Sequence, residues 1–170
     1  YDIHFDHPVW VHFIGIGGIS MSGLAEILHD RGFKVSGSDM KASPLTEHLE
    51  SLGISVQFPQ KSENIVPGIE LCVYTAAISE DNPEFQEVKR QNIPMMSRAE
   101  LLGRIMKNYK EAINVSGTHG KTTTTSMIGE ILMEAQMDPT ITVGGMMKDI
   151  GGNLRVGKSD VFLAEACEYT

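Results

Sequence analysis

Apolar residues along this chain follow two repeating patterns, that of a buried strand and that of an amphipathic helix. The apolar run over residues 9–14 predicts a buried strand. Apolar residues then recur every three or four positions as far as Leu28, which predicts a helix that ends near Gly32. A second strand is expected over residues 33–38. This order predicts a parallel strand, helix, strand unit with a right-handed crossover.

The same alternation continues through the first two thirds of the chain. Further strands are expected over residues 54–57, 70–75 and 93–96, and helices after Ser43-Pro44, after Asn82-Pro83 and over 98–106. Such alternation is typical of a doubly wound α/β fold, in which ligands bind at the carboxyl ends of the strands. The loops after residues 14, 38 and 75 are therefore expected around one crevice.

A short polar break, residues 107–110, separates this part from a second α/β unit. A strand that ends at Val115 leads through a glycine loop into a helix. A strand over 140–143 comes next, then a Gly-rich segment that includes Gly144-Gly145 and Gly151-Gly152, and then a strand over 160–165. Three short strands and one helix cannot bury a large core. We therefore expect one domain over residues 1–107 and an incomplete second domain over 108–170.

The loop over residues 117–123 carries the strongest chemical signal. Its backbone N–H groups and the positive end of the following helix dipole favour a phosphate. Lys121 adds a full positive charge, and the Thr122 hydroxyl stands where phosphate loops place a ligand of Mg²⁺. The general pattern has a glycine where this chain has Val115, so the loop is a shorter variant. The alternative is a helix cap whose glycines only form a turn, but Lys in a first helical turn opposes the dipole unless an anion binds.

A second glycine loop follows the first strand. Gly15-Ile16-Gly17-Gly18 resembles the dinucleotide-binding fingerprint, with Asp39 as the acid about 20 residues further on. Ser20 replaces the third glycine of that fingerprint, and it is small enough for close helix packing. This pattern predicts a phosphate at the helix N-terminus and a ribose hydroxyl at Asp39. A tight turn without a ligand is the alternative.

Composition excludes several classes of protein. The net charge is −8 without a Lys/Arg cluster, so neither a nucleic-acid surface nor a membrane surface is expected. No apolar run approaches the length of a membrane span, and no secretory signal is visible. Cys72 and Cys167 lack metal-site spacing and are expected to be unpaired in a reducing cytoplasm. His12 is expected to be a partly buried residue with satisfied hydrogen bonds. The oligomeric state does not follow from the sequence.

Five motifs together resemble the Mur ligases of peptidoglycan synthesis. They are residues 15–22 (Gly-Ile-Gly-Gly-Ile-Ser-Met-Ser), 37–39 (Gly-Ser-Asp), 98–102 (Arg-Ala-Glu-Leu-Leu), 117–124 (Gly-Thr-His-Gly-Lys-Thr-Thr-Thr) and 165–168 (Glu-Ala-Cys-Glu). The resemblance implies a Rossmann-like parallel-sheet domain followed by the start of a phosphate-loop ATPase α/β domain. It also implies an ATP- and Mg²⁺-dependent ligase that joins L-alanine to UDP-N-acetylmuramate through an acyl phosphate. Cys167 stands where the family often has Asp, which puts metal ligation around that turn in doubt. The chain alone is expected to be inactive.

The resemblance assigns a role to each candidate residue. Lys121 is the catalytic candidate, and Thr122 with Glu165 is the metal-binding pair. The ATP-binding candidates are Gly117, Thr118, His119, Gly120, Lys121, Thr122 and Thr123. The UDP-sugar-binding candidates are Gly15, Gly17, Gly18, Ser20, Met21, Ser38, Asp39 and Thr75.

Three other functions remain open at this point. An NAD-dependent dehydrogenase would explain the first glycine loop but not the second. A kinase or general phosphate-loop ATPase would explain only the second loop. A non-catalytic module that binds a nucleotide sugar would suit the length of the chain.

Overall fold

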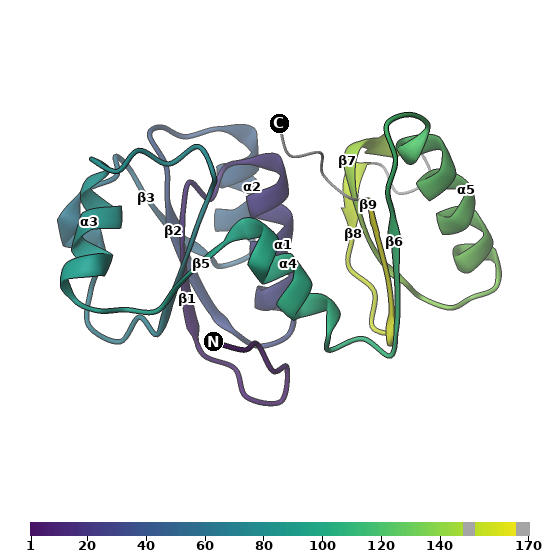
Figure 1. The fold of residues 1–170 in the computed structure, drawn as a ribbon, viewed down its shortest axis with the longest axis horizontal. Coiled ribbons are helices and arrows are strands. Elements are labelled where there is room, and N and C mark those ends of the chain that lie inside the picture. The colour runs from purple at the N-terminus through teal and green to yellow at the C-terminus, as the bar shows by residue number, and fades with distance from the viewer. Residues whose placement is uncertain (148–151, 166–170) are drawn as a thin grey trace. The chain divides into compact units, whose positions relative to one another are not determined.

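The chain folds into two compact units, which the computed structural model describes for residues 1–147 and 152–165. The first unit is Tyr1–Arg104 and the second begins at Ile105 (Figure 1). The first unit ends three residues before position 107, where the polar break of the sequence predicts a boundary.

The first unit is built around a sheet of five parallel strands. The strands lie in the order β3-β2-β1-β4-β5, so β1 is central. Val11 of β1 is in register with Val35 of β2 on one side and with Leu71 of β4 on the other. The predicted parallel α/β domain is therefore confirmed. Its elements are β1 (Trp10–Ile14), α1 (Ile19–Asp30), β2 (Lys34–Ser38), α2 (Pro44–Ser51), β3 (Ser55–Gln57), the 3₁₀ turn η1 (Ser62–Asn64), β4 (Leu71–Tyr74), α3 (Pro83–Arg90), β5 (Met95–Ser97) and α4 (Arg98–Met106).

Helices cover the two faces of this sheet unequally. Helices α1, α2 and α4 lie on one side, and α3 lies on the other (Figure 1). On the α3 side, Ile14, Cys72 and Val88 belong to one buried apolar cluster. Burial, and secondarily Glu84, raises the pKa of the Cys72 thiol to about 12. The expectation of an unpaired, buried thiol is therefore confirmed for Cys72, whereas Cys167 lies outside the described residues.

Local sequence signals set the starts of two helices. The Ser43 hydroxyl accepts the Thr46 N–H, and the Thr46 hydroxyl accepts the Ser43 N–H, so the two residues form a reciprocal capping box before α2. The Asn82 side chain accepts the N–H groups of Glu84 and Phe85 at the start of α3. Each cap precedes a proline in the first turn, where the missing N–H costs no helical hydrogen bond.

The second unit contains one helix packed on a sheet in the order β6-β9-β7-β8. Leu132 of α5 packs in a core cluster with Ile141 and Leu163 of the sheet. Its elements are β6 (Glu111–Val115), α5 (Lys121–Glu134), β7 (Thr140–Met147), β8 (Gly152–Arg155) and β9 (Val161–Glu165).

The strand β8 and its hairpin are absent from the sequence-based expectation. The sequence analysis assigned no strand to the Gly-rich segment, but Gly144 and Gly145 lie in β7, and Gly152 begins β8. The two strands pair antiparallel, whereas β6, β9 and β7 are parallel neighbours. Gly151 lies outside the described residues.

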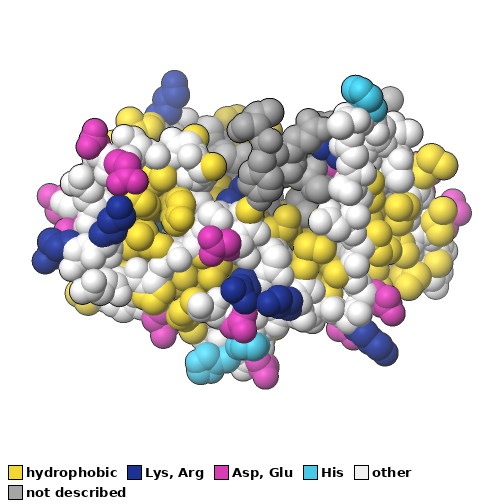
Figure 2. Space-filling view, viewed as in Figure 1, with side chains coloured by type: hydrophobic (Ala, Val, Ile, Leu, Met, Phe, Trp, Pro, Cys, Tyr) yellow, Lys and Arg dark blue, Asp and Glu magenta, His cyan; other side chains and the backbone are white. Residues whose placement is uncertain are grey.

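Apolar side chains also remain on the outside of the second unit. Met127 and Ile131 of α5 are 60% and 65% exposed, and Figure 2 shows hydrophobic side chains gathered over this helix. In the part of the chain that the structure describes, none of the helices has the length and apolar content to cross a bilayer.

Candidate functional site

The first glycine loop lies at the carboxyl end of the central strand. The N–H groups of Gly15 and Ile16 both donate to the Ser38 carbonyl at 2.9 Å, which ties the loop to the end of β2. Thr75 follows β4, and its methyl group would lie 3.8 Å from a Cβ placed on Gly15. The loops after residues 14, 38 and 75 therefore meet, as the sequence predicts.

Asp39 binds the glycine loop directly. Its Oδ2 accepts the Gly17 N–H at 2.8 Å, and its Oδ1 accepts the Met40 N–H at 2.8 Å. A Cβ on Gly17 would lie 2.5 Å from Asp39 Oδ2 and 3.0 Å from Thr46 Cγ2, so only glycine fits there. Both carboxylate oxygens already accept a backbone N–H, and each has a further lone pair for a ligand hydroxyl.

Arg98 adds a positive charge beside this loop. Its Nη1 donates to the Ser20 hydroxyl at 3.0 Å, and Ser20 lies in the first turn of α1. A guanidinium at a helix N-terminus makes the location more favourable for an anion such as a diphosphate. Sequence reasoning placed Arg98 in a motif without assigning it to the site, because 78 residues separate it from Ser20.

Some of the predicted UDP-sugar residues contribute no exposed side chain. Met21 is buried in the core, and Ser38 is fully buried. The Ser38 hydroxyl has no hydrogen-bond partner among the described residues. Gly18 is the N-cap of α1, and its N–H donates to the Gly15 carbonyl at 3.3 Å. Ser38 and Gly18 thus hold the glycine loop in place through main-chain hydrogen bonds.

The second glycine loop lies between β6 and α5. Gly117 and Gly120 have φ angles of 143° and 74°, which side-chain-bearing residues rarely adopt. The α5 helix begins at Lys121, and its first main-chain bond runs from the Thr124 N–H to the Gly120 carbonyl. The amides of the preceding residues therefore point out of the helix end, which suits an anion. Loop residues 116–120 are exposed, and Lys121 is half-buried.

The two metal-binding candidates contact each other. The Thr122 hydroxyl is 3.1 and 3.2 Å from the two carboxylate oxygens of Glu165. Glu165 ends β9 in register with Val115, the last residue of β6, which brings it beside the loop. A hydroxyl and a carboxylate are hard oxygen ligands of the kind that Mg²⁺ accepts. Within residues 1–147 and 152–165, no three His, Cys, Asp or Glu side chains gather as a metal cluster. Cys167 and Glu168 lie outside the described residues.

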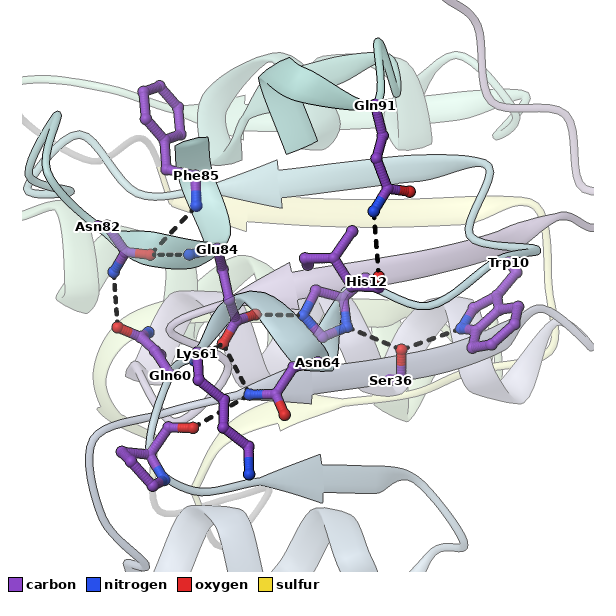
Figure 3. Close-up of polar contacts among 12 residues, drawn as sticks. Trp10, His12, Ser36, Gln60, Lys61, Asn64, Asn82, Glu84, Phe85 and Gln91 are labelled. Carbon is purple, nitrogen blue, oxygen red and sulfur yellow. Dashed lines mark hydrogen bonds and ion pairs between the residues drawn. The ribbon is translucent and has the colours of Figure 1, made fainter. Parts of the chain in front are cut away.

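A buried polar network on the α3 side of the first sheet escaped the sequence analysis. His12 is 1% exposed, more deeply buried than predicted, and its Nε2 lies 2.7 Å from Oε1 of the fully buried Glu84. Its Nδ1 lies 2.9 Å from the Ser36 hydroxyl, which also accepts the Trp10 indole N–H (Figure 3). The alternation of polar and apolar residues in β1 placed His12 in the strand, but it gave no sign of Glu84.

Comparison with known proteins supports one family. Residues 10–110 match the sequence profile described as "Mur ligase family, catalytic domain". The chain is 64% identical over its full length to a UDP-N-acetylmuramate–L-alanine ligase of Agathobacter rectalis, and 61% identical to the ligase of that name from Lachnospira eligens. It spans 37% of the length of each of these relatives.

Solved structures agree with these relatives. A UDP-N-acetylmuramate–alanine ligase from Thermotoga maritima matches 94% of this chain and 37% of its own, with a TM-score of 0.83 and 34% identity. A UDP-N-acetylmuramate:L-alanyl-γ-D-glutamyl-meso-diaminopimelate ligase from Neisseria meningitides matches 96% of this chain and 54% of its own. That match has a TM-score of 0.85 and 30% identity.

Proposed function

This chain belongs to the Mur ligase family, and from that premise we propose that it is the nucleotide-binding part of an ATP-dependent ligase joining L-alanine to UDP-N-acetylmuramate. The relatives of 64% and 61% identity that carry this activity in their names support the proposal most strongly. The two glycine loops, each leading into a helix, provide one site for each nucleotide.

In this proposal the domain predicted over residues 1–107 binds the UDP-sugar. The first glycine loop and Arg98 take the diphosphate, because the helix end and the guanidinium both favour negative charge. Asp39 accepts a hydroxyl of the ribose while it continues to bind the Gly17 N–H.

Residues 108–170 supply part of the ATP site. The loop amides of residues 117–123 and the Lys121 ammonium bind the phosphates, and Thr122 with Glu165 would hold Mg²⁺. When bound, Mg²⁺ would neutralise negative charge on the phosphates. The muramate carboxylate attacks the γ-phosphorus of ATP, so that a bond from the carboxylate oxygen to phosphorus forms as the bond to ADP breaks. The alanine amine then displaces inorganic phosphate and loses a proton. Lys121 acts by stabilising the charge of the transferred phosphoryl group.

Calorimetric titration of the 170-residue protein with UDP, NAD and ATP tests the first step of this proposal. We expect UDP to bind without Mg²⁺, because the loop and Arg98 recognise the diphosphate. NAD carries a diphosphate as well, but its nicotinamide has no predicted partner, so we expect it to bind more weakly than UDP. The Gly17→Ala variant is expected to lose UDP binding, since the new Cβ would displace Asp39. Tight NAD binding without a response to UDP would favour the dehydrogenase alternative and refute the proposal.

A further inference from the structure

A groove of about 620 Å³ opens on the face of β2 and β3 of the first unit. It exists because the connection from β3 to β4 contains only the three-residue turn η1, where a doubly wound fold usually places a helix. Side chains of β1, β2 and β3 form its floor, and residues of the connection form one wall. None of the candidate UDP-sugar-binding or ATP-binding residues lines it.

The floor of the groove rests on the network of His12 and Glu84 (Figure 3). Because Ser36 accepts the Trp10 N–H, its own proton can be donated to Nδ1 of His12, and the proton on Nε2 is then donated to Glu84. Glu84 also accepts the Asn64 amide at 3.1 Å and the Lys61 N–H at 3.3 Å. The buried carboxylate is thus satisfied, and Ser36 keeps one lone pair for a ligand.

The polar groups along the groove offer mainly acceptors. Asn64 uses its amide nitrogen twice, toward Glu84 and toward the Pro59 carbonyl, so its Oδ1 remains as an acceptor. Gln57 donates to Ser55 through its nitrogen, and among the described residues its Oε1 has no hydrogen bond. The exposed Glu63 carboxylate accepts only the Ser62 hydroxyl among them. A ligand here must therefore bring N–H or O–H donors.

The opposite end of the groove is positively charged. Lys34 lies in register with Trp10, and Gln57 lies in register with Ser38, so the two ends are four residues, or about 13 Å, apart along β2. The Lys34 ammonium lies 3.6 Å from the centre of the Trp10 ring, and among the described residues no carboxylate pairs with it. A ligand carboxylate can therefore reach Lys34.

We propose that this groove binds a short zwitterionic peptide, with its carboxylate at Lys34 and its ammonium among the acceptors of Asn64, Gln57 and Glu63. An extended peptide spans roughly 3.3–3.6 Å per residue, so three residues reach about 10 Å, and the Lys34 side chain covers the rest. A single amino acid is too short to contact both ends. Peptide N–H groups fit the acceptors along the floor.

Titration of the 170-residue protein with trialanine tests this site. We expect saturable binding by calorimetry with a dissociation constant of about 1 mM or lower. We also expect a change in the fluorescence of Trp10, the sole tryptophan of the chain, which lines the floor of the groove. Saturating UDP should leave the trialanine affinity unchanged, since the glycine loop does not line the groove.

Variants and blocked peptides identify the contacts. Lys34→Gln should weaken trialanine binding about tenfold, because one charge-assisted contact is lost, while Lys41→Gln outside the groove should leave it unchanged. Trialanine with an acetylated N-terminus and an amidated C-terminus should not bind. The proposal would be overturned if trialanine gave no saturable heat, or gave heat without a change in Trp10 fluorescence. It would also be overturned if the blocked peptide bound as tightly as trialanine, or if Lys34→Gln bound trialanine as tightly as the parent protein.

Discussion

The carboxylate of Asp39 and the guanidinium of Arg98 lie around the same loop and affect an incoming diphosphate in opposite ways. Asp39 holds the Gly17 N–H and so fixes the loop, but its negative charge repels a phosphate. Arg98, bonded to Ser20, offsets that repulsion at the end of α1. We infer that the loop depends on both residues, one for its shape and the other for its charge.

Replacement of Arg98 tests whether this residue supplies the positive charge for the diphosphate. Arg98→Ala should weaken UDP binding by about 1.5–3 kcal/mol, the range for a hydrogen bond to a charged group, or roughly 10- to 150-fold. The loss should be smaller for uridine, which has no diphosphate. Arg104→Ala, which removes an exposed pair with Asp2, is the matched control in calorimetry. Equal losses for UDP and uridine would argue against a role at the diphosphate.

The sequence predicted the features that local patterns and the topology of a parallel sheet determine. The caps at Ser43 and Asn82 and the glycine loops follow from local patterns. Arg98 and Glu84 come to their partners across 78 and 72 residues, so only tertiary folding brings them together. No periodicity along the chain encodes such a pairing.

At the scale of elements, the β7–β8 hairpin depends on Asp138, which precedes β7. Its Oδ1 accepts Arg155 Nη1 and its Oδ2 accepts the Lys158 N–H, both at 2.9 Å. The Asp138 carbonyl also accepts the Ser159 hydroxyl. One side chain thus joins the start of β7 to the end of β8. The sequence analysis assigned no second strand here, because glycines weaken a strand, and it gave no indication that an ion pair would join the two strands.

Unfolding measured at decreasing pH should reveal how much the Asp138 carboxylate stabilises the second unit. The Lys158 N–H, and after it Arg155, lower the pKa of Asp138 below its ordinary value of 3.8. Since the folded pKa is depressed, the carboxylate stabilises the fold above pH 3.8, and this contribution is lost as pH falls through the folded pKa. Asp138→Asn should therefore lower the urea midpoint of unfolding at neutral pH. In acid, the midpoint of this variant should approach that of the parent protein.

The matched control for this titration is Asp160→Asn, an exposed replacement in the same unit. It should leave the urea midpoint of the second unit unchanged at neutral pH. If the urea midpoint of Asp138→Asn were lower than that of the parent protein by the same amount at every pH, the charge of Asp138 would not account for its effect on stability.

At the scale of the whole molecule, the chain spans 37% of the length of the two relatives named above and contains two glycine loops, each of which we propose to bind a nucleotide. In-line transfer requires the reacting groups to be held within about 3–3.5 Å of one another. The described residues supply phosphate-binding groups, and they show no side chain that we can assign to the alanine. The sequence predicted the parallel α/β fold because strands and helices alternate along the chain.

We therefore predict that the 170-residue protein does not catalyse ligation. Phosphate release measured with ATP, Mg²⁺, UDP-N-acetylmuramate and alanine should equal the rate without alanine. The full-length protein should release phosphate, and its Lys121→Ala variant should be about 10²- to 10³-fold slower in kcat. Alanine-dependent release by the 170-residue protein would contradict this prediction.

The connection between β3 and β4 has a consequence for the order in which the protein is made. A ribosome releases His12, Lys61 and Asn64 before Glu84, the carboxylate that all three bind in the finished fold. Until the first turn of α3 has left the exit tunnel, the nascent sheet would bury an imidazole without its partner, which is costly. We therefore expect the first three strands to pack stably only after residue 84 has emerged.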